Sequence, residues 1–194
     1  MEYNLKQVLE EDAKNYPCCH KTFVERFRSS LFSDPISDQS KIWQYIYTLR
    51  HCENALVLYA NAKEDKKHLK YVVSLIMVWY WKYRLRKMSY KTQFQIPPGV
   101  VGPGMTIWHW GPIIINPKVK IGKNVTLNPG VVIGHKNKDE SAGAIIGDNV
   151  FIGAGSIIIG QIHIGDNVCI GQNVVVVKDV PANTTIVAQK PRVI

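Results

Sequence analysis

The sequence lacks the features of a secreted, metal-binding or membrane-spanning protein. Its four cysteines, Cys18, Cys19, Cys52 and Cys169, have neither metal-ligand spacing nor the pattern of a disulfide framework, which favours a reducing compartment. The opening MEYNLKQVLEEDAK has no basic segment followed by an apolar one, so we expect no secretory signal. The most apolar run, residues 71–81, is far shorter than the ~20 residues that span a bilayer. We therefore expect a cytoplasmic protein.

Acidic residues are scarce in one part of the chain. The formal net charge is +9, and residues 63–91 account for +7 of it, because nine Lys and Arg residues there face only Glu64 and Asp65. Aromatic residues are interleaved with these cations. The pattern favours a core or subunit interface with a solvated basic edge; contact of residues 66–91 with a membrane surface is the second interpretation. We expect no nucleic-acid binding, because no recognised binding motif accompanies the charge.

The chain divides into two halves with different apolar periods. Up to about residue 91 the spacing is helical and predicts helices over 5–14, 22–32, 41–61 and 66–91, the first with its acids on the side opposite its apolar residues. After the IPPG turn the period becomes six. We therefore expect an α+β protein with a helical region over residues 1–94, for oligomerisation or partner contact, and a repeat domain over residues 95–194.

The period of six is carried by two apolar series. One runs through Ile146, Ile152, Ile158, Ile164, Ile170 and Val176, and the other lies two residues earlier. Such regularity indicates stacked coils that bury their apolar side chains against one another, here in the hexapeptide form of a parallel β-helix. The register breaks once, between Ile133 and Ile146, which predicts one extruded loop.

A histidine stands in this pattern where an aliphatic residue is expected. Counting back by sixes from Ile133 through Ile115 leads to His109, between Trp108 and Trp110. The period therefore predicts an inward-facing histidine, and a polar group in such a slot needs a partner or a chemical role.

Two stretches carry a resemblance to a known family. The closing VVVVKDVPANTTIVAQKPRVI is similar to the last coils of left-handed β-helix acyltransferases, and IPPGVVGPGMTIWHWGPIIINPKVKIGKNVTLNPGVVIG resembles the serine O-acetyltransferases among them. The resemblance implies a left-handed β-helix, an acetyl-CoA donor, no metal, and a homotrimer whose donor site lies between neighbouring β-helices. Dimers of trimers through the N-terminal helices would fit the same resemblance.

The resemblance also implies roles for individual residues. His109 matches the general base, a role that suits a residue type titrating near neutral pH. His135, after Gly134, resembles the base of sugar acetyltransferases and is the rival. Donor contacts are expected from Gly134, Ala154, Gly155, Gly171, Lys190 and Arg192, and acceptor contacts from Trp108, Trp110 and Gln95. Trp108 and Gln95 replace aspartates of serine acetyltransferases; Asp139 or Glu140 could orient the base instead.

Three functions remain open at this point. The first is O-acetylation of a small hydroxyl acceptor such as serine. The second is acetylation of a sugar hydroxyl or amine in surface polysaccharide synthesis, which the missing aspartates favour. The third is a catalytically silent trimeric scaffold, which would not bind CoA.

Overall fold

The structure is a computed structural model that describes residues 3–16, 39–64, 68–137 and 142–189. Its residues fall into two compact units, Met1–Gln93 and Phe94–Ile194, and each is described here by itself. The helix expected over residues 22–32 lies outside the described residues, as do Asp139, Glu140, Lys190 and Arg192.

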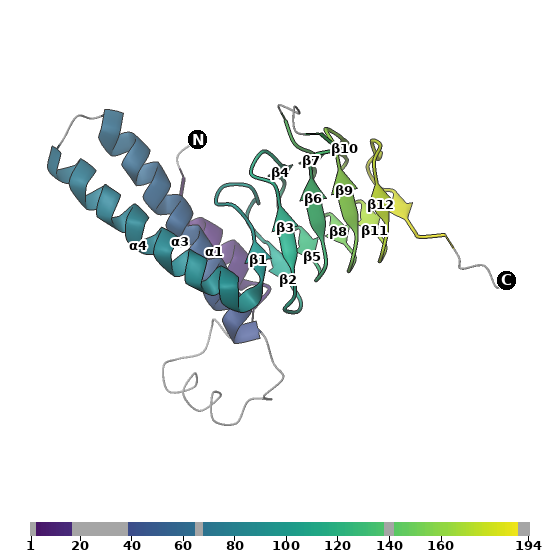
Figure 1. Cartoon of the computed structure of the whole chain (residues 1–194), viewed down its shortest axis with the longest axis horizontal. Helices are drawn as coiled ribbons and strands as arrows, with labels where there is room; N and C mark the ends of the chain where they lie inside the picture. The colour runs from purple at the N-terminus through teal and green to yellow at the C-terminus, as the bar shows by residue number, and fades with distance from the viewer. Residues whose placement is uncertain (1–2, 17–38, 65–67, 138–141, 190–194) are drawn as a thin grey trace, which may run out of the picture. The chain divides into compact units, whose positions relative to one another are not determined.

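The first unit contains three described helices: α1 (Leu5–Ala13), α3 (Gln39–Glu64) and α4 (His68–Thr92). All 14 glycines of the chain follow residue 98, and no proline lies between residues 39 and 92, so nothing in the covalent chain interrupts α3 or α4. α3 extends slightly beyond its predicted range at both ends, α4 ends one residue beyond its predicted end, and the two helices pack side by side (Figure 1). The Asn4 side chain caps α1 by accepting a hydrogen bond from the Gln7 amide at 3.2 Å.

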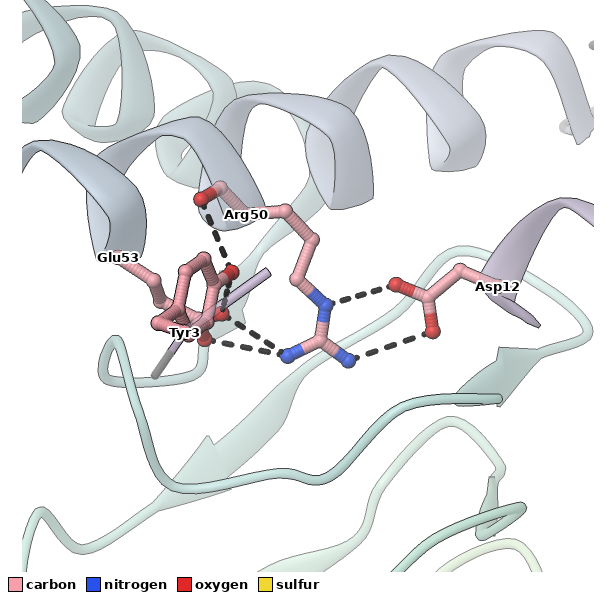
Figure 2. Close-up of polar contacts among 4 residues, drawn as sticks. All are labelled: Tyr3, Asp12, Arg50 and Glu53. Atoms are coloured by element: carbon pink, nitrogen blue, oxygen red, sulfur yellow. Dashed lines mark hydrogen bonds and ion pairs between the residues drawn. The ribbon is translucent and has the colours of Figure 1, made fainter. Parts of the chain in front are cut away.

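A buried ionic network joins α1 to α3 (Figure 2). The Arg50 guanidinium donates from Nε to Asp12 at 2.7 Å and from Nη1 to Glu53 at 3.1 Å, and the Tyr3 hydroxyl donates to Glu53 at 2.9 Å. Burial acts to lower the pKa of Arg50, but the two carboxylates outweigh it and raise that pKa above its ordinary value. Asp12 was expected on the solvated side of its helix and is instead fully buried, because Arg50 reaches it.

The second unit is a parallel β-helix of short strands in three sheets (Figure 1). One sheet has the order β1-β3-β6-β9-β12, the second β10-β7-β4, and the third β13-β11-β8-β5-β2, and every neighbouring pair is parallel. The strands are β1 (Phe94–Gln95), β2 (Thr106–Ile107), β3 (Ile113–Ile115), β4 (Lys120–Ile121), β5 (Thr126–Leu127), β6 (Val132–Gly134), β7 (Ile145–Ile146), β8 (Phe151–Ile152), β9 (Ile157–Ile159), β10 (His163–Ile164), β11 (Cys169–Ile170), β12 (Val175–Val176) and β13 (Thr185–Ile186).

Both apolar series point into the prism, as the period of six predicts. Leu127, Ile133, Ile146 and Ile152 of one series are buried, and so are Val125 and Val131 of the other. β6 pairs with β9 while β7 pairs with β4, so the break in register lies between β6 and β7, where the sequence predicts the extruded loop.

One edge of the prism, between the second and third sheets, carries a ladder of asparagines that we call the asparagine edge. Asn124 donates through its side-chain amide to Asn149 at 3.1 Å, Asn149 to Asn167 at 3.1 Å, and Asn167 to Asn183 at 2.9 Å. Each has a positive φ between 55° and 59°, a conformation that asparagine tolerates better than most residues. The ladder therefore fixes successive coils to one another at their tightest turn.

Candidate active site

The edge of the prism between the third and first sheets gathers most of the residues predicted from the sequence. It consists of residues 108–112, 128–130, 153–155 and 171–173, which we call the His109 edge. Backbone hydrogen bonds stack these turns: the Gly130 amide donates to Pro112 at 2.7 Å, the Gly155 amide to Pro129 at 2.9 Å, and the Asn173 amide to Ala154 at 2.9 Å. His109, Ala154, Gly155 and Gly171 thus lie along one continuous edge.

His109 does not point into the prism, so the prediction of an inward slot is wrong. Ile107 pairs with Leu127, and Ile115 pairs with Ile133. From one inward position to the next across this edge, the chain therefore takes eight residues in the coil of His109 and six in the following coil. The two additional residues belong to the turn that contains His109, and they displace its side chain to the surface, where it is exposed. Ile107, 2% exposed, fills the inward slot instead.

Two indole rings flank the exposed imidazole. Trp108 is 54% exposed and Trp110 is 37% exposed, so both present ring surface to solvent. Gly111 follows with φ of 144°, and a Cβ on it would lie 2.7 Å from the Cβ of Pro129 in the next coil. This close approach requires glycine at that point and holds the Trp-His-Trp turn against the stack.

Below this turn, the His109 edge is built from small residues. The predicted donor contacts Ala154, Gly155 and Gly171 have at most a methyl side chain, and the Asn173 side chain lies against Gly155. The amides of Gly155 and Gly171 already donate to Pro129 and Ile186, at 2.9 and 2.8 Å. A ligand lying along this edge would therefore contact the small side chains and the backbone surface, not these two N–H groups.

The remaining predicted residues lie elsewhere on the unit. Gly134 is the last residue of β6 and His135 follows it, whereas His109 precedes β3; because β3 and β6 are parallel neighbours, the two histidines lie at opposite edges of one sheet. Gln95 is exposed on β1, paired in register with Ile114. His163, which we expected at the surface, is exposed on β10. The chain by itself does not bring His135 to His109.

Two polar residues of this region were missed in the sequence. The Asn128 side chain donates to the Ile152 carbonyl at 2.9 Å, and the buried Ser156 hydroxyl donates to the Gly171 carbonyl at 2.7 Å. Both tie one turn of the His109 edge to the turn of the following coil. Ser156 could have been found, because it stands in an inward slot of the period of six where the neighbouring coils have valine or isoleucine.

The described residues contain neither a metal site nor a membrane-spanning helix. No group of three or more His, Cys, Asp or Glu side chains there could hold a metal ion. Among the described helices, none combines the length and the apolar character needed to cross a membrane.

Comparison with known proteins agrees with this geometry. Residues 143–178 match the family of bacterial transferase hexapeptides, in its six-repeat form. The chain is 42% identical over 110 residues to serine acetyltransferase 1, chloroplastic, of Arabidopsis thaliana, which covers 56% of this chain and 35% of that one. It is 40% identical over 93 residues to the putative colanic acid biosynthesis acetyltransferase WcaB of Escherichia coli K12, covering 48% and 57%. The matched region thus spans only about a third to three fifths of these relatives.

The fold is also that of solved serine acetyltransferases. The Neisseria gonorrhoeae enzyme, determined in complex with serine, superposes with a TM-score of 0.60 at 25% identity, covering 96% of this chain and 68% of that one. This likeness confirms the predicted left-handed hand of the β-helix. In sequence and in fold, the chain is a hexapeptide-repeat, left-handed β-helix protein that resembles the serine acetyltransferases.

Proposed function

We propose that this protein is an acetyl-CoA-dependent O-acetyltransferase with His109 as general base. The observation that carries the proposal is the exposed His109, held between two tryptophans at the head of an edge built from small residues. The similarity to serine acetyltransferases supplies the reaction type, and serine is the first candidate acceptor.

The chemistry follows from the position of the imidazole. His109 takes the proton of the acceptor hydroxyl while that oxygen attacks the thioester carbonyl. A C–O bond forms, the C–S bond breaks, and the CoA thiolate leaves and takes up a proton. The donor is expected along the His109 edge, because Ala154, Gly155 and Gly171 carry at most a methyl group where an extended pantetheine arm would pass, and Lys190 and Arg192 are candidates for its phosphates.

A homotrimer would complete the site. His109 and His135 lie at opposite edges of one sheet, so one subunit can offer both edges to its two neighbours. With three-fold symmetry, the His109 edge of one subunit would meet the loop-bearing edge of the next, which carries Gly134 and His135. This arrangement places the donor between subunits and keeps His135 as the rival base.

A sugar acceptor is the second candidate, for a specific reason. Serine acetyltransferases resemble this chain closely around His109 but carry aspartates at the positions of Trp108 and Gln95. That exchange removes two carboxylates that would serve an amino-acid acceptor, whereas the exposed rings of Trp108 and Trp110 offer apolar platforms suited to sugar rings. The similarity to WcaB points the same way.

The test is thiol release from acetyl-CoA, with L-serine and separately with a panel of nucleotide sugars. We expect His109→Ala to lower turnover by about 10²–10⁴-fold with the acceptor that is used. His163→Ala is the matched control, because His163 is exposed on another sheet and should leave turnover unchanged. His135→Ala separates the rival base from the proposed one.

Each outcome decides between the candidates. Turnover with serine that His109→Ala abolishes establishes serine acetylation. Turnover only with sugars identifies the second candidate. A loss in His135→Ala with full activity in His109→Ala reverses the assignment of the base, and no turnover together with no CoA binding leaves the scaffold.

A further inference from the structure

Helix α4 has two apolar faces, of which α3 covers one. The face toward α3 consists of Tyr71, Ser74, Val78, Trp81, Leu85, Met88 and Thr92, spaced alternately three and four residues apart and buried or half-buried. Tyr71 meets Tyr59 of α3, and Trp81 stacks on His51 with ring centroids 4.4 Å apart. This face accounts for the packing of the two helices along their lengths (Figure 1).

The opposite face of α4 repeats the same spacing at the surface. It consists of Leu69, Val72, Ile76, Trp79, Tyr83 and Tyr90, with Arg86 in phase between the last two, and we call it the outer stripe. All of its members are exposed, Trp79 by 70% and Tyr90 by 81%. A contiguous row of large apolar side chains at the surface marks an interaction site more often than a solvated face.

The charges beside the outer stripe have one sign. Between His68 and Thr92 there is no aspartate or glutamate, and Lys70, Lys82, Arg84, Arg86, Lys87 and Lys91 are all exposed. Some of these cations lie over rings: Lys87 Nζ is 5.0 Å from the centroid of Tyr83, and Arg84 is 5.8 Å from that of Tyr80. Aromatic rings with adjacent cations are the combination found where a helix meets lipid headgroups.

The positive charge of α4 decides whether the outer stripe contacts a second copy of this chain or a lipid surface. A second copy pairing α4 with α4 would bring the same six cations together from both sides, whereas an anionic lipid surface is complementary to them. We propose that the outer stripe of α4 lies on an anionic membrane surface, with its apolar side chains in the headgroup layer and its cations at the lipid phosphates. The helix lies in the interface, since it is not apolar enough to cross the bilayer.

The test uses the full chain and vesicles of phosphatidylcholine with or without phosphatidylglycerol. We expect co-sedimentation with the anionic vesicles only. Arg84→Gln/Arg86→Gln/Lys87→Gln should lower partitioning about fivefold per removed cation. The matched control is Lys118→Gln/Lys120→Gln/Lys123→Gln, which removes the same charge from exposed positions of the β-helix and should bind nearly as the native chain does.

A second measurement tests the apolar part without changing the charge. Brominated lipid should quench the native fluorescence, and Trp79→Phe should lose most of that quenching. Equal partitioning on both lipid compositions, or an equal loss in both triple variants, would overturn the proposal. The outer stripe would instead join copies of this chain if two results came together. The native chain would not bind the vesicles, and the Ile76→Ser/Trp79→Ser variant would sediment as a smaller oligomer than the native chain in sedimentation velocity. None of these readouts depends on acetyl transfer.

Discussion

Substitution of Asp12 by alanine tests the buried network that joins α1 to α3. Arg50, 1% exposed, donates to Asp12 through Nε at 2.7 Å and through Nη2 at 3.3 Å (Figure 2). Without this carboxylate, both N–H groups of a buried cation lose their acceptor. Breaking a buried ion pair by removing one partner costs about 3–5 kcal/mol, and because Glu53 still faces Arg50 we expect about 3 kcal/mol.

The assay is urea unfolding of the helical unit, with an exposed carboxylate of α1 as control. Glu10 lies 3.9 Å from Lys6 with both side chains largely exposed, so Glu10→Ala should cost at most about 0.5 kcal/mol. Replacing Trp108 and Trp110 by phenylalanine in every variant restricts the tryptophan signal to the helices. A loss of about 3 kcal/mol then lowers the midpoint by about 1–3 M urea at an unchanged slope.

A double-mutant cycle shows whether the cost comes from the pair. Arg50→Met alone removes the guanidinium from two buried carboxylates, so Asp12→Ala combined with it should cost clearly less than the sum of the single changes. Equal midpoints for Asp12→Ala and Glu10→Ala, or strict additivity in the cycle, would refute the reasoning.

Three further predictions concern other parts of the chain. Burial, followed by the charge of Arg84, lowers the pKa of His51, and its buried Nε2 has no hydrogen-bond partner among the described residues. The unfolded chain therefore binds a proton that the folded chain does not, so stability should fall as the pH drops below about 6.5. In His51→Phe, the urea midpoint should change less between pH 7.5 and 5.5 than in the native chain. The same pH dependence of the midpoint in both proteins would contradict this. Burial raises the pKa of the Cys52 thiol to about 11, so iodoacetamide at pH 7.5 should modify the half-buried Cys169 before Cys52. Peptide mass spectrometry gives the order, and labelling of Cys52 before Cys169 would contradict the argument. Gly155 has φ of 72° and a Cβ there would collide with the Asn173 side chain, so Gly155→Ala should destabilise the β-helix by at least ~1–2 kcal/mol in thermal melting. Gly134→Ala should not, because a Cβ there would make only an ordinary contact with Ile159 at 3.9 Å; equal effects of the two substitutions would contradict the argument.

The β-helix was predictable because its pattern is short-range. A period of six requires only that each turn of the chain bury the same positions, and neighbouring residues report that directly. The error at His109 has the same origin. The two apolar series lie two residues apart, so an insertion of two residues moves one series onto the other. Ile107 and Ile113 therefore keep a spacing of six, and the sequence alone does not reveal the insertion.

The buried network and the active-site assembly could not be predicted in this way. Asp12 and Arg50 lie 38 residues apart, and nothing near either one distinguishes it from a solvated charge on a helix. In the proposed trimer, the partnership of His109 with His135 or the donor would depend on surfaces that belong to neighbouring subunits. Helical spacing did locate α3 and α4.

The asparagine edge determines where this β-helix can change length. Successive rungs of its ladder are 25, 18 and 16 residues apart in sequence, yet their hydrogen bonds are nearly equal in length. The strand register shows why: from Ile121 to Leu127, Ile146 to Ile152 and Ile164 to Ile170, this edge always takes six residues, and the other two edges absorb every insertion and deletion. A lineage of such proteins could therefore remodel the proposed acceptor and donor surfaces by lengthening turns at those two edges, while an added residue at the asparagine edge would interrupt the ladder.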